Sequence, residues 1–289
     1  MDNSPNSSPH ALAKNPKKYN QIKSETNQMN EKIKWALTVT ISSLLGYIKL
    51  LTIRTKKDLP EWESAIKNKK VLIIGTGPSL DKADKEYFER FDTHIYINHA
   101  IKIKDKENSF FFTTDVGVLN DITKMPYFSK IETLGNKRSI VAPIFFQQCI
   151  SPNTQLLNKI TWIAPDSARY KISFKKILKI KLPLPPVLWP KQPSLKELDQ
   201  WFYSKEQVLS FPIIEKTSAL SAILFAAKYR PQKIRLIGCD FGEGRALALS
   251  KELHQQPIGA FSGAANTFTS LKEYLKQKSI PVENDSWAN

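Results

Sequence analysis

Short apolar runs that stop at a glycine constrain the fold of this chain most. Residues 71–75 read VLIIG and residues 234–238 read IRLIG, and each run has the length of a strand rather than that of a helix. A nearly continuous apolar strand is typical of a parallel sheet that is buried on both faces. The sequence therefore predicts an α/β fold.

The rest of the chain beyond residue 58 alternates between the two kinds of pattern. Further strands are expected at residues 94–98, 109–115, 139–146 and 280–285, and helices at 81–90, 217–229 and 267–278. Alternating strands and helices indicate a mostly parallel sheet with helices on both faces. We expect one doubly wound, Rossmann-like domain over residues 58–289.

Two different segments precede this domain. Residues 1–30 are polar and are predicted to be a disordered arm, because they cannot bury enough apolar surface to order themselves. Residues 31–57 contain an uncharged stretch from Trp35 to Ile48 between flanking lysines. A spanning helix needs about 20 apolar residues, so an amphipathic helix lying in a membrane interface fits better. A short membrane span and an ordinary packed helix remain the alternatives.

The net charge of +16 requires an acidic partner. Nucleic acid is the less favoured class, because no recognisable RNA-binding motif interleaves aromatic residues with lysines. An anionic membrane or a phosphorylated substrate is favoured. The two cysteines do not form a disulfide framework, Cys239 is expected in the core, and no Cys/His spacing resembles a zinc site.

Residues 169–191 form a basic, proline-interrupted stretch that lacks helical character. One interpretation is a solvated charged loop. Because Phe174, Ile177 and Leu178 suit a solvated loop poorly, we favour a basic lid that touches anionic lipid or a phosphorylated acceptor.

A glycine-rich turn directly after the first strand carries the clearest functional signal. Glycine lets a backbone turn sharply and approach a ligand, and the amides that follow can bind a phosphate or a ribose at a helix start. The third glycine of a dinucleotide fingerprint is replaced by Leu80, and no Walker lysine follows. A tight turn without a ligand is the alternative. The candidate binding residues of the turn are Gly75, Thr76, Gly77, Pro78 and Ser79.

Polar residues also follow the other expected strands or open the Ala-rich helix. Ligands of open α/β sheets bind beyond the carboxyl ends of the strands, so these residues are expected at one edge. Each of three residues has an alternative role. Asp115 could cap a helix, and Thr217 could be a plain N-cap. His99 could lie beside the site without taking part in binding or catalysis. The residues are Asn98, His99, Thr114, Asp115, Thr217, Ser218, Asp240 and Gly242.

Four segments in this order, VLIIGTGPSL, IYINHA, EKTSALSAILFAA and IRLIGCDFGEG, resemble the bacterial lipooligosaccharide sialyltransferases. The chain is also similar to the lipopolysaccharide-core Kdo transferases in its Thr114-Asp115-Val116 and in a lysine-rich stretch before the Ser-containing helix. The resemblance covers roughly residues 70 to 280. Both families use CMP-activated 2-keto-3-deoxy sugars.

The resemblance implies that the first turn and Asn98 line the cytidine and phosphate side, and that Thr217 and Ser218 hold the sugar carboxylate. It also implies inverting, metal-independent transfer without a cofactor, with a histidine as general base. Gly263 stands where that histidine is expected, which leaves His254 and Asp115 as the candidate bases.

We therefore expect a glycosyltransferase that moves Kdo or a sialic acid from its CMP conjugate to a lipooligosaccharide at the cytoplasmic face of the inner membrane. A homo-oligomer is compatible with the sequence. The alternatives are a nucleotide-binding enzyme similar to the motility accessory factors and pterin pyrophosphokinases, which share the Gly-Thr-Gly-Pro-Ser-Leu turn, and a degenerate relative without activity. A basic protein that binds nucleic acid is a further, weaker alternative.

Overall fold

The computed structural model describes residues 60–103, 109–115, 118, 140–143, 160–165, 194–203, 210–211, 217–242, 244–250 and 261–287. The expected arm at 1–30, the membrane-contacting helix at 31–57, the lid at 169–191 and His254 lie outside these residues.

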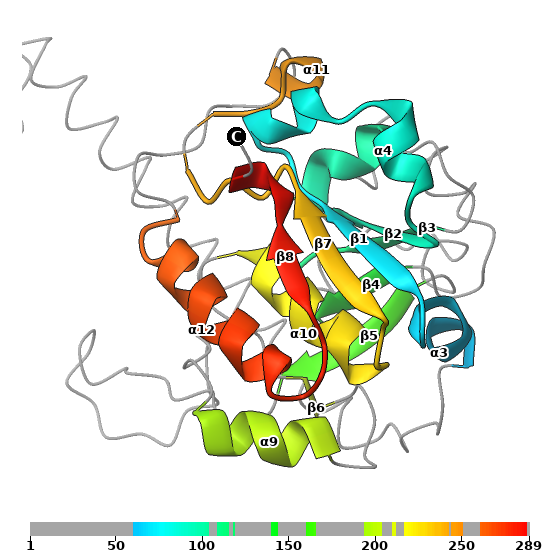
Figure 1. The fold of residues 1–289 in the computed structure, drawn as a ribbon, viewed down its shortest axis with the longest axis vertical. Helices are drawn as coiled ribbons and strands as arrows, with labels where there is room; N and C mark the ends of the chain where they lie inside the picture. Colours follow the sequence, from blue (N-terminus) through cyan, green and yellow to red (C-terminus); the bar gives the residue numbers. More distant parts are fainter. Residues whose placement is uncertain are drawn as a thin grey trace, which may run out of the picture.

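A sheet of eight parallel strands organises the molecule, in the spatial order β6-β5-β4-β3-β2-β1-β7-β8 (Figure 1). The prediction of an α/β fold with a parallel sheet is confirmed. The strands are β1 (Lys70–Ile74), β2 (Thr93–Ile97), β3 (Ser109–Phe112), β4 (Ile140–Pro143), β5 (Ile160–Pro165), β6 (Ser210–Phe211), β7 (Lys233–Ile237) and β8 (Val282–Asn284).

Alternate residues of each central strand pack on opposite faces of the sheet, as the period of two requires. Val71 and Ile73 of β1 belong to one buried cluster, and Leu72 and Ile74 belong to the other. Both faces of the strand are therefore covered, which explains why its sequence is apolar without interruption.

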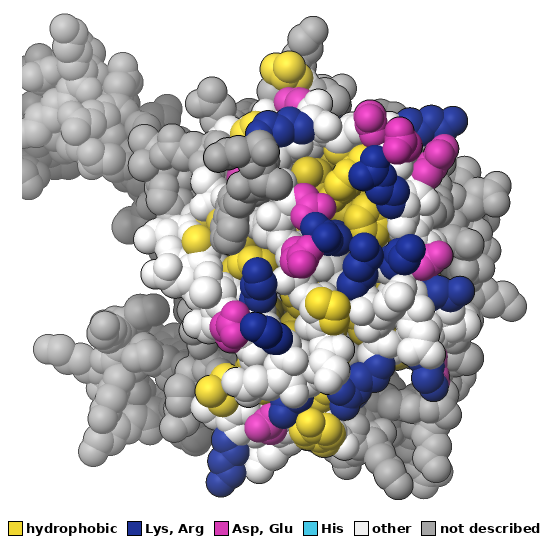
Figure 2. Space-filling model, viewed as in Figure 1, with side chains coloured by type: hydrophobic (Ala, Val, Ile, Leu, Met, Phe, Trp, Pro, Cys, Tyr) yellow, Lys and Arg dark blue, Asp and Glu magenta, His cyan; other side chains and the backbone are white. Residues whose placement is uncertain are grey.

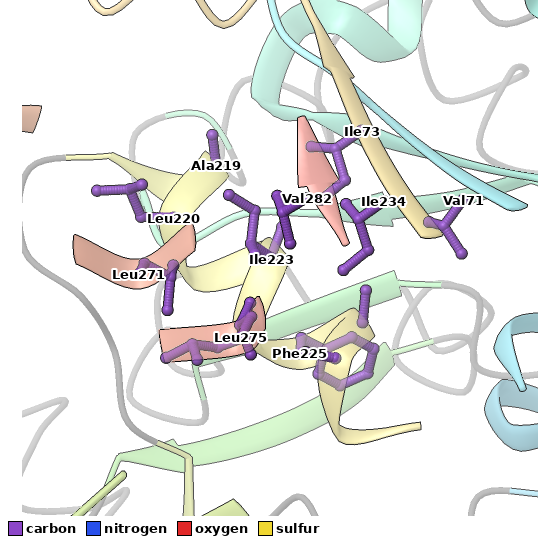
Figure 3. Packing of buried hydrophobic residues seen from close by; sticks show 14 of the residues in the cluster. Val71, Ile73, Ala219, Leu220, Ile223, Phe225, Ile234, Leu271, Leu275 and Val282 are labelled. Carbon is purple, nitrogen blue, oxygen red and sulfur yellow. The ribbon is translucent and has the colours of Figure 1, made fainter. Parts of the chain in front are cut away.

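Helices α10 (Ser218–Lys228) and α12 (Ala264–Lys276) cover the first face. Ten consecutive residues of α10 are buried, in agreement with its alanine-rich sequence. Helix α3 (Pro60–Ile66) completes this layer through Trp62, whose ring lies 4.6 Å from that of Phe225. Figure 3 shows the core between β1, β7 and β8 and the two longer helices, with Val71, Ile73, Ile234, Val282, Leu220, Ile223, Leu271 and Leu275.

The second face is covered by short elements, and it differs from the single helix expected over residues 81–90. A 3₁₀ helix, η1 (Pro78–Lys82), is followed by a separate helix, α4 (Lys85–Glu89). The break has a local cause, because the Asp84 side chain accepts a hydrogen bond from the Tyr87 amide at 2.7 Å and begins a new helix. The remaining elements that pack here are η2 (Asn98–Ile103) and α11 (Leu247–Ser250).

Helix α9 (Leu195–Tyr203) is attached to α12 by polar contacts. Asp199 accepts hydrogen bonds from the Tyr274 hydroxyl at 2.9 Å and from the Lys278 ammonium group at 2.7 Å. These two bonds lower the pKa of the Asp199 carboxyl, the Lys278 contact having the larger effect.

The order of the strands creates a switch point in the middle of the sheet. From β1 the chain adds β2 to β6 on one side, and β7 and β8 then follow on the other side. The loops that leave the carboxyl ends of β1 and β7 therefore run in opposite directions, which opens a crevice for a ligand between them in proteins of this kind. The short 3₁₀ helix η5 (Asp285–Trp287) ends the described chain beside this point.

The surface seen in Figure 2 carries Lys and Arg side chains spread among acidic ones over β7 and β8. By sequence, the described residues are close to charge balance, so nearly all of the +16 belongs to the remaining residues. Within the described residues, no helix is long and apolar enough to cross a membrane.

Candidate functional site

The turns that follow β1 and β7 are in direct backbone contact at the switch point. The Gly75 amide donates to the Ile237 carbonyl at 2.8 Å, and the Gly77 amide donates to the Gly238 carbonyl at 2.8 Å. A Cβ atom on Gly75 would lie 2.2 Å from the Gly238 oxygen, and Gly238 itself has a φ of +66°. Glycine is therefore required here by the neighbouring strand, before any ligand is considered.

Ser79 and Asp240 connect the same two turns through side chains. The buried Ser79 hydroxyl donates to Asp240 Oδ2 at 2.9 Å and accepts from the Gly238 amide at 3.0 Å. The Ser79 amide also donates to the Asp240 carboxylate, at 3.3 Å and 3.4 Å from its two oxygens. Asp240 thus occupies the amino end of η1.

In this arrangement most amides after the glycines bind groups of the protein, whereas the sequence analysis expected them to bind a phosphate or a ribose at a helix start. The Gly75, Gly77, Ser79 and Leu80 amides all donate within the protein, and Pro78 has no amide hydrogen. An internal carboxylate stands where the ligand anion was expected. Only the Thr76 amide in this turn makes no hydrogen bond to another described residue.

The segment after β7 folds back over the first turn and brings in a residue that the sequence analysis missed. Arg245 Nη1 donates to the Thr76 hydroxyl at 2.7 Å, although the two residues are 169 positions apart. The Arg245 side chain is partly buried, and this burial lowers the pKa of its guanidinium group. No local pattern marks this arginine, because its proximity to Thr76 depends on the pairing of β1 with β7.

A hydrogen bond between Thr113 and the predicted site residue Asn98 joins the ends of β3 and β2. The Thr113 hydroxyl donates to Asn98 Oδ1 at 2.8 Å, and Asn98 has a φ of 52°. Asparagine tolerates this left-handed conformation better than most residues. Because the Asn98 oxygen accepts, its Nδ2 group is left as a donor, and it makes no other hydrogen bond within the described residues.

Helix α10 begins against the end of β3. The Ser218 hydroxyl accepts from the Thr114 amide at 3.1 Å and lies 2.8 Å from the Thr114 hydroxyl. The Thr217 hydroxyl accepts from the Ala219 amide at 3.2 Å, so Thr217 has the N-cap role that was its alternative. Both hydroxyls that were expected to hold a sugar carboxylate thus have partners in the protein.

Three further predicted residues lie at the same edge with different surroundings. Asp115 is exposed, and its Oδ1 accepts from the Val118 amide at 3.4 Å. His99 lies partly buried on η2. Gly242 is exposed, and a Cβ atom there would meet only the Asp240 carbonyl oxygen at 3.9 Å.

The structure therefore brings all thirteen described candidate residues to one edge of the sheet; these are Gly75, Thr76, Gly77, Pro78, Ser79, Asn98, His99, Thr114, Asp115, Thr217, Ser218, Asp240 and Gly242. Gly242 follows Asp240 after the same strand. His254, the other candidate base, lies outside the described residues. Cys239 is buried as expected for a core residue, and burial raises the pKa of its thiol.

The edge offers hydrogen-bond donors from three neighbouring strands. They are the Thr76 amide after β1, the Asn98 amide group after β2 and the Arg245 guanidinium beyond β7. Such donors suit an anionic or carbonyl-bearing ligand. Across the described residues, no group of three or more His, Cys, Asp or Glu side chains is placed to hold a metal ion.

No protein-family model matches the chain, and no curated protein is significantly similar to it in sequence.

Proposed function

We propose that this protein is a glycosyltransferase that binds a CMP-activated 2-keto-3-deoxy sugar at the carboxyl edge of its sheet. The sugar is Kdo or a sialic acid, and the acceptor is a lipooligosaccharide or a related phosphorylated glycolipid. The observation that carries the proposal is the convergence of the four resembling segments on one edge, on both sides of the switch point.

Hydrogen bonds between these segments support a common site. Thr113 links the end of β3 to Asn98 after β2, and Ser79 links the turn after β1 to Asp240 after β7. Thr114 links the end of β3 to the start of α10. Polar side chains at four adjacent strand ends, each held by a neighbour, support the proposal, because nucleotide binding is favoured by a preorganised edge.

The proposed reaction needs a base and a stabilised leaving group. The acceptor hydroxyl forms a bond to the anomeric carbon of the sugar while the bond from that carbon to the CMP phosphate oxygen breaks. The hydroxyl proton passes to Asp115 or His254, and CMP leaves with its charge held by hydrogen-bond donors of the edge. Asp115 is exposed at this edge, which keeps it a candidate.

A thermal-shift screen with CMP, CDP, UDP, GDP and ATP, each with Mg²⁺ or with a chelator, tests the donor class. A ligand at 100 times its dissociation constant stabilises a fold by about 2.7 kcal/mol, which raises the melting temperature of a domain of this size by roughly 5–10 °C. CMP is expected to give this shift without metal. A shift with UDP or GDP but none with CMP would overturn the donor class, and metal-dependent ATP binding would favour the pyrophosphokinase alternative.

Location at an anionic membrane surface is part of the same proposal. It rests on the sequence of residues 31–57 and on the distribution of charge. The described residues are close to charge balance, so the excess of Lys and Arg belongs to the rest of the chain. The full chain is expected to sediment with vesicles that contain anionic lipid, and less with zwitterionic ones. A chain beginning at Asp58 is expected to remain in the supernatant; equal sedimentation of both chains would refute anchoring by residues 31–57.

A further inference from the structure

Arg245 is fixed over the first turn by the backbone of its own segment. The Ala246 amide donates to the Thr76 carbonyl at 2.9 Å. The Leu247 amide donates to the Asp81 carboxylate, at 2.9 Å and 3.0 Å from its two oxygens. Gly244, at a φ of +97°, lies against the Pro78 ring. These contacts hold the segment on both sides of Arg245.

These contacts bring the Arg245 guanidinium group to the switch point, where it loses part of its hydration. It is partly buried, and it donates to the Thr76 hydroxyl at 2.7 Å. Burial lowers the pKa of Arg245, but an arginine remains protonated throughout the physiological range. A fixed, partly desolvated guanidinium cation is suited to a phosphate group.

The Thr76 amide adds a second donor beside this cation. The Thr76 hydroxyl accepts the hydrogen bond from the Arg245 guanidinium group. The Thr76 backbone amide makes no hydrogen bond to another described residue. Asp240 is bonded to Ser79 at the amino end of η1, and a Cβ atom on Gly77 would lie 2.0 Å from its Oδ2. Repulsion by this carboxylate disfavours an anion at the Ser79 amide, which leaves the Thr76 amide and Arg245 as the donors for a phosphate.

We propose that Arg245 and the Thr76 amide bind the phosphate of the nucleotide at the β1–β7 switch point. This inference rests on the proposed nucleotide-binding function and assigns a residue that neither the sequence motifs nor the resemblance identified. The guanidinium group forms a charge-assisted hydrogen bond to a phosphate oxygen. The Thr76 hydroxyl orients the guanidinium group.

Comparing each nucleotide with its nucleoside isolates the phosphate contact. Titration calorimetry on the full-length protein would use cytidine and CMP, with uridine and UMP, guanosine and GMP, and adenosine and AMP as further pairs. The expected result is that Arg245→Gln weakens CMP binding roughly 10- to 100-fold, the size of a lost hydrogen bond to a charged group, while cytidine binding is unchanged.

Arg90→Gln is the matched control, because it removes the same charge from an exposed arginine that pairs with Glu86 on α4. It is expected to leave CMP binding unchanged. Arg245→Lys retains the charge without the planar fork and is expected to show an intermediate loss. Thr76→Val removes the orienting hydroxyl and retains the amide, and provides a second test if Arg245→Gln fails to fold.

The outcomes separate the inference from the proposed function. CMP binding that is equally strong in the wild type, Arg245→Gln and Thr76→Val would overturn the inference and leave the function standing. If CMP fails to bind but another nucleotide shows a phosphate preference that depends on Arg245, the function is wrong and the phosphate site stands. If no nucleotide binds better than its nucleoside, the phosphate site is refuted.

Discussion

Substitution of Gly75 by alanine separates two reasons for a glycine in the first turn. In the structure an added Cβ would lie 2.2 Å from the Gly238 carbonyl oxygen, 2.7 Å from its carbon and 2.9 Å from the Cys239 sulfur. The first two atoms are backbone of the neighbouring strand end and cannot rotate away. The turns after β1 and β7 must therefore separate, and this weakens the Gly75–Ile237 and Gly77–Gly238 hydrogen bonds.

The expected cost follows from these contacts. Overpacking of a well-packed site typically costs about 1–3 kcal/mol, and a rigid backbone obstacle puts this substitution at the upper end, about 3 kcal/mol. For a domain of this size such a loss lowers the melting temperature by roughly 6–12 °C. Gly75→Ala is expected to show this loss with no ligand present.

Gly242→Ala is the control, because the position is exposed and its added Cβ would have only an ordinary contact at 3.9 Å. Urea denaturation followed by far-UV circular dichroism gives the free energy of unfolding of both variants. If Gly75→Ala is as stable as Gly242→Ala and instead loses only CMP binding, the glycine serves the ligand and the argument from strand contact is wrong.

Three other predictions concern the site and its support. Ser79→Ala leaves the buried Gly238 amide without its acceptor and is expected to cost about 1–3 kcal/mol of unfolding free energy in urea denaturation, whereas Ser270→Ala on the exposed face of α12 should have little effect; equal losses would contradict the bridging role. One of Asp115→Asn and His254→Ala is expected to lower turnover about 10²–10⁴-fold with CMP binding intact, and near-full activity in both would refute this choice of base. The lowered pKa of Asp199 means that its contribution to stability is present above the usual carboxyl pKa and is lost as the pH falls through the lowered value. Asp199→Asn should therefore reduce the acid dependence of the melting temperature, and an unchanged dependence would show that the contacts of Asp199 contribute no stability.

The central strands could be predicted from the sequence because strands buried on both faces consist mainly of apolar residues. The runs in β1 and β3 are apolar after their first residue, and the apolar Ile-Tyr-Ile ends β2, which identifies strands covered on both faces without knowledge of their partners. Helix α10 begins one residue after the predicted N-cap, Thr217, because a capping hydroxyl is a local signal. The start of a second helix at Asp84 was missed, although its cap is equally local.

Strands β5 and β6 and helix α9 were not predicted. Strand β6 has only two residues, and β5 lies in a region without a flanking glycine or a clear alternation. Helix α9 has an amphipathic pattern that follows the proline-rich stretch, and its attachment to α12 depends on the tertiary contacts of Asp199. Short elements carry too few residues for a periodic pattern to be distinguished from chance.

For the candidate site, the sequence alone placed the residues that follow the predicted strands at one edge, since the carboxyl ends of parallel strands share an edge whatever the strand order, but it did not place Arg245 there. Only the tertiary structure decided which of these residues contact and hydrogen-bond one another. That Gly75 faces Gly238, that Asp240 caps η1 in place of a ligand anion, and that Arg245 reaches Thr76 all depend on β7 pairing with β1. Local composition specifies how a segment folds, but the neighbour of a strand is selected by the packing of the whole chain, and the contacts at the switch point follow from that neighbour.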